Sequence, residues 1–200
     1  MLLYDSAISG NCYKVRLLLA QLGLPYERRE LDVVDRSNRP ELLGGLNPSL
    51  RVPTIVLDDG RPIGESGAIL SYFGEGTQFV PPDRYDRAQM LQWMFFEQYE
   101  LEINIAVVRF WMHVLDGVPE GAEQQYETKL AAGYKTLDAM ERYLPGREWF
   151  VGDSPTLADI ALYGYTHVAH EGGFEMERYP LIRAWLHRVA AQPGHVTIDA

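Results

Sequence analysis

The stretch Glu65-Ser66-Gly67-Ala68-Ile69-Leu70-Ser71-Tyr72 decides the fold, because of what precedes it. Residues 52–57, Val-Pro-Thr-Ile-Val-Leu, are typical of a short strand that begins at a proline, and residues 58–63 of a turn and a short return strand. A serine at a helix start offers a hydroxyl and free N–H groups to an anion. A proline that begins a strand is a candidate for a cis bond, which exposes backbone groups instead of pairing them. Together they predict a site for a small, peptide-like molecule that carries a carboxylate.

The elements around this stretch predict a small α/β domain over residues 1–76 that resembles thioredoxin. Apolar residues at 15, 18, 19 and 22 mark one face of a helix, and Gly23 ends it. The expected order is strand, helix, strand, helix, hairpin and helix. These elements cover residues 2–4, the helix before Gly23, 26–33, 40–46, 53–63 and 65–74.

The rest of the chain predicts a second, all-helical domain over residues 84–200, so the fold class is α/β followed by all-α. Residues 74–84 contain glycines, adjacent prolines and little periodicity, which indicates a linker. After residue 84 nothing looks like a strand. Helices are expected over residues 84–113, 120–144, 156–168 and 179–191.

Composition limits the partners of the chain. It has 200 residues, of which 46% are hydrophobic, and its net charge of −10 argues against binding to nucleic acid. No apolar run approaches the roughly 20 residues that span a bilayer, and the N-terminus has no signal-peptide pattern. We therefore expect a cytoplasmic protein without a membrane partner. A single cysteine, Cys12, excludes a disulfide within the chain.

The loop Ser9-Gly10-Asn11-Cys12-Tyr13-Lys14, before the first expected helix, is a candidate site for thiol chemistry. A helix N-terminus carries partial positive charge and unpaired N–H groups. A thiol placed there that also receives a hydrogen bond from a hydroxyl is favoured as the thiolate. Taken alone, Ser9 reads as an ordinary loop or capping residue, but the motifs of residues 52–72 reverse that interpretation. Tyr4 is the other nearby hydroxyl, and it is expected to pack within its strand.

Taken together, the loop at Ser9, the segment Val52-Pro53 and the pair Glu65-Ser66 resemble the glutathione transferase family, in its bacterial serine-type pattern. The resemblance places Ser9 at the position of the hydroxyl that activates the glutathione thiol. The usual proline two residues later is Asn11 here. This departure resembles some bacterial members in which an Asn side chain also donates to the sulfur, so the division of labour between Ser9 and Asn11 stays open.

The resemblance also assigns the residues that hold glutathione. It implies a cis bond at Pro53 and main-chain contacts from Val52 to the cysteinyl part, as in a strand added to an edge. Ser66 would bind the γ-glutamyl carboxylate, and Glu65 would lie near the ammonium group. Arg51 could reach the glycyl carboxylate, the alternative being a solvated loop charge.

Cys12 admits two interpretations. If the helix dipole lowered its pKa, the enzyme would form mixed disulfides with glutathione. The interpretation that we prefer is a small apolar core residue, which is where free cysteines usually sit.

The second expected domain supplies a capping pattern and the expected second-substrate residues. Thr156 and Asp159 fit a helix capping box, which the family shares and which we assign to stability. The resemblance implies a second-substrate pocket formed by Asn104, Val108, Trp111 and, from the first domain, Ile8. The histidines show no spacing typical of metal ligands, so no metal is expected.

The sequence thus predicts a homodimeric glutathione transferase, in which glutathione thiolate attacks a hydrophobic electrophile, a reaction associated with detoxification. Two alternatives stay open. One is glutathione-dependent reduction of disulfides or peroxides at the same site. The other is a binding protein of this fold without enzymatic activity.

Overall fold

A computed structural model describes all residues 1–200, which form two compact units. The first unit comprises Met1–Thr77 together with Gln192–Ala200, and the second comprises Gln78–Ala191. Residues 192–200, which we expected in the helical domain, are part of the first unit, where their carbonyls accept hydrogen bonds from its first helix and from Arg28 of its second strand. No helix in either unit is both long enough and apolar enough to cross a membrane.

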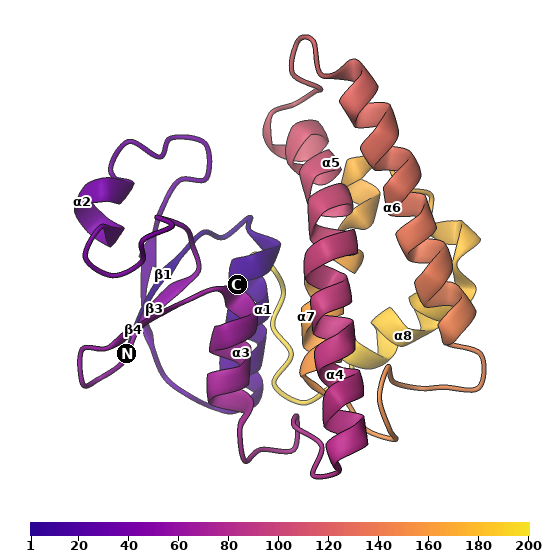
Figure 1. Cartoon of the computed structure of the whole chain (residues 1–200), viewed down its shortest axis with the longest axis horizontal. Coiled ribbons are helices and arrows are strands. Elements are labelled where there is room, and N and C mark those ends of the chain that lie inside the picture. The colour runs from indigo at the N-terminus through magenta and orange to yellow at the C-terminus, as the bar shows by residue number, and fades with distance from the viewer. The chain divides into compact units, whose positions relative to one another are not determined.

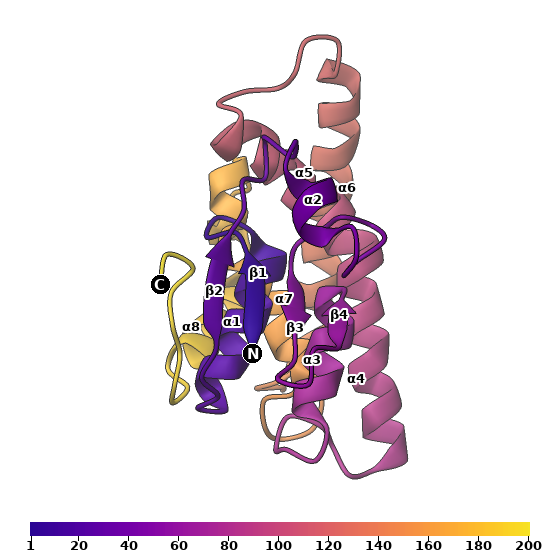
Figure 2. The same ribbon diagram turned by 90° about the vertical axis from the view of Figure 1, so that its left-hand side faces the viewer.

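The first unit is built on a four-stranded sheet in the order β2-β1-β3-β4 (Figures 1 and 2). β1 pairs in parallel with β2 and antiparallel with β3, and β4 returns antiparallel along β3. This is the thioredoxin-like arrangement expected from the sequence. The strands are β1 (Leu2–Asp5), β2 (Glu27–Glu30), β3 (Thr54–Val56) and β4 (Pro62–Gly64), and the helices are α1 (Gly10–Gln21), α2 (Arg39–Leu43) and α3 (Ser66–Gly74).

Helices cover both faces of this sheet. Successive side chains along β1 point to opposite faces, so each face presents apolar residues for a helix to cover. On one face, Leu3 packs with Val15 of α1 and Ile69 of α3. On the other face, Tyr4 packs with Leu43 of α2. Both views show α1 and α3 side by side on the first face (Figures 1 and 2). The two helices α1 and α3, which carry predicted site residues, are thereby packed against the same face of the sheet.

The second unit is entirely helical, as expected, but its first long helix is not a regular α-helix. Residues 84–114 form one continuous helical run in which π-helical segments alternate with α-helical ones. Apolar periodicity does not reveal π-helical segments. The wider turn of a π-helix only rotates the apolar face of the residues that follow it about the helix axis. The elements are α4 (Arg84–Phe96), η1 (Glu97–Ala106), α5 (Val107–Arg109), η2 (Phe110–Val114), α6 (Glu123–Tyr143), α7 (Leu157–Thr166), η3 (Ala169–Gly172), η4 (Met176–Arg178) and α8 (Pro180–Ala190).

The predicted capping box at the start of α7 is confirmed. The Asp159 carboxylate accepts hydrogen bonds from the Thr156 N–H (2.8 Å), the Phe150 N–H (3.1 Å) and the Trp185 Nε1–H (3.0 Å). Burial raises the pKa of Asp159, and the donated hydrogen bonds oppose that rise. Because Phe150 lies in the preceding loop and Trp185 on α8, this carboxylate joins three segments of the unit.

Candidate functional site

Ser9 caps the N-terminus of α1. Its Oγ accepts a hydrogen bond from the Cys12 N–H (3.3 Å), and its carbonyl accepts one from the Tyr13 N–H (2.9 Å). The first turn of α1 contains no acidic residue, so no carboxylate of the helix offsets the positive end of its dipole. A hydroxyl that already accepts from a backbone N–H still has its own hydrogen to donate. Half-buried Ser9 is therefore suited to donate to an anion placed at this helix end.

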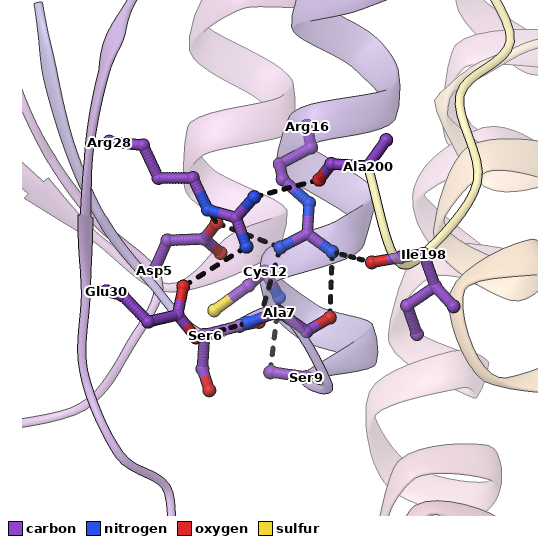
Figure 3. Close-up of polar contacts among 10 residues, drawn as sticks. All are labelled: Asp5, Ser6, Ala7, Ser9, Cys12, Arg16, Arg28, Glu30, Ile198 and Ala200. Carbon is purple, nitrogen blue, oxygen red and sulfur yellow. Dashed lines mark hydrogen bonds and ion pairs between the residues drawn. The ribbon is translucent and has the colours of Figure 1, made fainter.

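Cys12 lies at the third position of α1 and has no exposed surface. Burial raises the pKa of its thiol, the nearby Asp5 charge raises it further, and the hydrogen bond with Ser9 lowers it. Figure 3 shows the sulfur inside the polar cluster around Asp5. These features describe a neutral, inaccessible thiol, and they support the interpretation of Cys12 as a core residue.

Asn11 and Ser66 bring the N-termini of α1 and α3 together. The Ser66 hydroxyl donates to Asn11 Oδ1 (3.3 Å), although the two residues come from different helices. The same oxygen accepts a hydrogen bond from Lys14 Nζ (2.7 Å). Because both helices expose N–H groups at their starts, two positive dipole ends lie at one edge of the unit. Such an edge suits a ligand with more than one negative group.

Glu65 makes the turn from β4 into α3 in a single residue. Its φ is 64°, a left-handed conformation that is uncommon for a residue other than glycine. The Glu65 side chain is exposed, whereas Ser66, the first residue of α3, is 5% exposed. Residues with such strained backbone conformations are common at functional sites, where contacts with the surrounding structure hold the conformation in place. The turn leaves the Ser66 hydroxyl and N–H at the start of the helix.

The Val52–Pro53 peptide bond is cis, as the sequence led us to expect. β3 begins only at Thr54, so the backbone of Val52 takes no part in the sheet pairing. A backbone edge outside the strand pairing is the kind to which an extended peptide ligand can add as a further strand. Arg51, beside Val52, is exposed.

The buried Asn47 side chain holds the loop of residues 51–54 by hydrogen bonds, a role that the sequence analysis missed. Its amide nitrogen donates to the Arg51 carbonyl (3.2 Å) and to Thr54 Oγ1 (2.9 Å). A Cβ atom on Gly64 would lie 2.7 Å from that nitrogen, so only glycine leaves room for it. In the sequence, Asn47 is typical of a helix breaker because it precedes a proline. Its second role depends on its burial, which only the structure shows.

The residues expected to line a second-substrate pocket occupy varied environments. In the second unit, the Asn104 amide donates to the Glu100 carbonyl (2.7 Å), Val108 has no exposed surface, and Trp111 is half-buried. Ile8 is half-buried in the loop before α1. Their assignment to a pocket stays a prediction. No three side chains of His, Cys, Asp or Glu gather in a way that could hold a metal ion.

Comparison with known proteins identifies the family. Residues 8–75 match the family model of the glutathione S-transferase N-terminal domain, and residues 86–193 match that of the C-terminal domain. A glutathione S-transferase structure from Pseudomonas fluorescens is 44% identical, with a TM-score of 0.95 over 100% of this chain and 98% of that one.

Relatives with other activities also align along most of the chain. A disulfide-bond oxidoreductase of Escherichia coli is 27% identical over 94% of this chain and 89% of its own length. A maleylacetoacetate isomerase of Pseudomonas aeruginosa is 27% identical over 97% of this chain and 93% of its own. The matched domains and the fold of both units lead to one conclusion: the chain belongs to the glutathione S-transferase family.

Proposed function

We propose that the chain is a glutathione transferase in which Ser9 stabilises the thiolate of bound glutathione. The observation that carries this proposal is the hydrogen bond from Ser66 to Asn11, which unites the starts of α1 and α3. Glutathione is a small peptide with a thiol near its centre and a carboxylate at each end. An edge with two helix N-termini, a donor hydroxyl and an unpaired strand edge matches that distribution of groups.

Each part of glutathione has a proposed partner. The Ser66 hydroxyl and N–H bind the γ-glutamyl carboxylate, and the exposed Glu65 carboxylate pairs with its ammonium group. The Val52 backbone pairs with the cysteinyl residue, and Arg51 reaches the glycyl carboxylate. In this pose the sulfur meets the Ser9 hydroxyl at the N-terminus of α1.

The proposed reaction is conjugation. The Ser9 hydroxyl donates to the sulfur, with Asn11 assisting, and lowers the pKa of the bound thiol. The thiolate then attacks an electrophilic carbon of a hydrophobic second substrate: a sulfur–carbon bond forms, and the leaving group departs with its electron pair. The protein contributes thiolate stabilisation and positioning. Ile8, Asn104 and Trp111 are the residues proposed to contact the second substrate, whereas Val108, which has no exposed surface, is not available for such a contact in this structure.

Calorimetric titration with glutathione and a conjugation assay with an activated aryl chloride test this proposal. We expect saturable binding, and ultraviolet absorbance of a thiolate at a pH where free glutathione is protonated. Absence of glutathione binding would overturn the proposal. Binding without turnover of any electrophile would favour a non-catalytic binding protein of this fold.

A second candidate is glutathione-dependent reduction of disulfides, which the similarity to a disulfide-bond oxidoreductase favours. The same bound thiolate would attack sulfur instead of carbon, and a second glutathione would complete the exchange. Burial of Cys12 argues against a protein thiol as the intermediate. Rates with a mixed disulfide and with the aryl chloride, measured on one preparation, discriminate the two reactions.

We also propose a homodimer formed through one face of the first long helical run. Leu91, Phe95, Tyr99 and Ile103 recur at four-residue intervals and are 38%, 63%, 72% and 47% exposed. Large apolar side chains in a row along a helix are typical of a protein interface. Analytical ultracentrifugation at micromolar concentration should show a species of twice 22.8 kDa. Phe95→Glu should convert it to the monomer, and a monomeric wild type would contradict the proposal.

A further inference from the structure

Residues 192–200, the C-terminal strap, are held by side chains rather than by backbone pairing. The carbonyls of Val196, Ile198 and Ala200 all accept hydrogen bonds from the first unit. They lie at every second residue, and the segment ends in a turn in which the Ala200 N–H donates to the Thr197 carbonyl (3.2 Å). The donors are Tyr13 Oη at 2.7 Å, Arg16 Nη2 at 2.6 Å and Arg28 Nη1 at 2.8 Å, respectively.

The strap begins in close contact with the end of α1. Gly194 has a φ of +73°, and a Cβ atom on it would lie 2.9 Å from Gln21 Cα and 3.0 Å from the Ala20 carbonyl oxygen. Both the conformation and the space therefore require glycine at this position. A side chain there would push the strap away from α1.

Arg16 binds the strap and the loop before α1 with one guanidinium group (Figure 3). Its Nη2 donates to the carbonyls of Ile198 (2.6 Å) and Ala7 (2.9 Å). Its Nη1 donates to Asp5 Oδ2 (2.8 Å) and to the Ser6 carbonyl (3.3 Å). The side chain is 2% exposed, so these hydrogen bonds are shielded from water.

A second route runs from the strap to the same loop through β2 (Figure 3). Arg28, which holds the Ala200 carbonyl, also pairs with Glu30 (3.1 Å) and with the buried Asp5 carboxylate. Glu30 in turn accepts a hydrogen bond from the Ala7 N–H (2.6 Å). Arg16 thus holds the Ala7 carbonyl directly, whereas Arg28 reaches the Ala7 N–H only through the Glu30 carboxylate.

This loop carries the hydroxyl that the proposed reaction uses. The Ser6 carbonyl, to which Arg16 donates, also accepts the hydrogen bond of the Ser9 N–H (3.0 Å). Ser9 Oγ then caps α1 through the Cys12 N–H (3.3 Å). A chain of direct contacts therefore leads from Ile198 through Arg16 and Ser6 to Ser9.

We propose that the C-terminal strap is a positioning element for Ser9, and that Arg16 is the positioning residue that transmits its docking to the loop. The proposal rests on the proposed role of Ser9. A docked strap gives Arg16 Nη2 its acceptor at the Ile198 carbonyl, and so keeps the guanidinium where it holds the Ser6 and Ala7 carbonyls in place. An undocked strap leaves this loop, and with it the hydroxyl, in a broader distribution of positions.

Gly194→Ala in the full chain tests the strap, with Gly146→Ala as its matched control. Gly146 has a φ of +74°, nearly that of Gly194, but open space around its would-be Cβ. The readouts are hydrogen exchange of the amides of residues 6–12, the pKa of bound glutathione by thiolate absorbance, and the dissociation constant of glutathione. For Gly194→Ala we expect exchange in the loop to rise about tenfold and the pKa of the bound thiol to move upward. The dissociation constant, measured at a pH where bound glutathione is protonated, should change less than twofold, because a shift in the pKa of the bound thiol alters affinity only where the thiolate forms. Gly146→Ala should leave all three readouts at their wild-type values.

Tyr13→Phe is a milder variant that removes only the hydroxyl, which donates to the Val196 carbonyl (2.7 Å) and lies 3.2 Å from His195 Nε2 of the strap. Its control is Tyr143→Phe, which removes a comparable bond to the Phe150 carbonyl (3.1 Å) in the second unit. We expect about a threefold rise in loop exchange for Tyr13→Phe and none for Tyr143→Phe. This pair keeps the test valid should Gly194→Ala fold poorly.

The outcomes separate the two proposals. If the protein binds glutathione as a thiolate but neither strap variant alters loop exchange or the bound-thiol pKa, the strap proposal is wrong and the proposed function stands. If the wild type binds no glutathione, the proposed function fails, and hydrogen exchange alone decides whether the strap holds the loop. A loss of thermal stability without a change in the loop would show a merely structural strap.

Discussion

The N-termini of α1 and α7 are both capped by a hydroxyl residue, but the surroundings of the two caps differ. At α7, Thr156 and Asp159 are 2% and 1% exposed, and the carboxylate at the third position accepts the Thr156 N–H. At α1, Ser9 is half-buried, and the third position holds the neutral thiol of Cys12 instead of an acid.

The difference lies in where the negative charge comes from. The α7 terminus has its own carboxylate, so its N–H groups and its dipole are satisfied within the fold. The α1 terminus lacks one, and it stays available to an anion from outside. A hydroxyl cap with an internal acid is therefore a structural element, whereas the same cap without one is a candidate binding site.

The largest expected effect concerns the cap of α7, whose charges are satisfied within the fold. Asp159→Ala removes the acceptor for donors in the Phe150 loop, at the α7 cap and on α8, and leaves them buried without a partner. We expect the free energy of unfolding to fall by about 3–4 kcal/mol. Urea denaturation of the purified protein measures it. A loss below about 1 kcal/mol would show that the buried network contributes little.

Ser9→Ala tests the cap of α1, the candidate binding site. Its cost in unfolding free energy should be about 1 kcal/mol, the usual value for a lost helix cap. Loss of a hydrogen bond to the thiolate should cost about 1.5–3 kcal/mol, which raises the pKa of bound glutathione by about one to two units. The pH dependence of conjugation measures this shift.

Cys12→Ala is the control for Ser9→Ala, since the buried thiol is not expected to touch glutathione. It should leave the pKa of bound glutathione and the rate at neutral pH unchanged. Accumulation of a mixed disulfide between Cys12 and glutathione would contradict the transferase interpretation and identify a thiol-exchange enzyme.

Ser66→Ala sharpens the comparison at the second helix start, that of α3. Removal of its hydroxyl should weaken glutathione binding by about 1.5 kcal/mol, the lower end for a charge-assisted bond because the Ser66 N–H remains. The Michaelis constant for glutathione should rise about tenfold while kcat changes little, since the carboxylate is held equally in ground and transition states. An unchanged Michaelis constant would exclude Ser66 from the carboxylate site.

The smallest expected effect concerns the thiol that stands in place of an acid in α1. Burial raises the pKa of Cys12, so the folded state keeps its proton above the ordinary value of 9.0, at which the unfolded chain loses it. The unfolded state then binds fewer protons, and the free energy of unfolding falls as pH rises above 9.0. The slope should be up to about 1.4 kcal/mol per pH unit. Cys12→Ala should lack this term, and parallel pH curves for the two proteins would contradict it.

Much of the site follows from local sequence. The strand that begins at Val52-Pro53, the hairpin and the helix start at Ser66 are each specified by neighbouring residues, and the capping box of α7 lies within four residues. Fold class and the approximate ends of most helices were therefore predicted correctly. The π-helical segments in residues 84–114 were not, because apolar spacing is compatible with either helix type.

Sequence alone singled out the candidate residues of the site, because turn, cap and strand preferences act over a few positions. Only the tertiary structure decided how those residues meet. Ser66 binds Asn11 across 55 positions, and Arg16 binds the Ile198 carbonyl across 182, so neither contact leaves a periodic or local signal. Such contacts arise when α1 packs on the sheet, since burial of Arg16 forces its guanidinium to find acceptors wherever the fold places them.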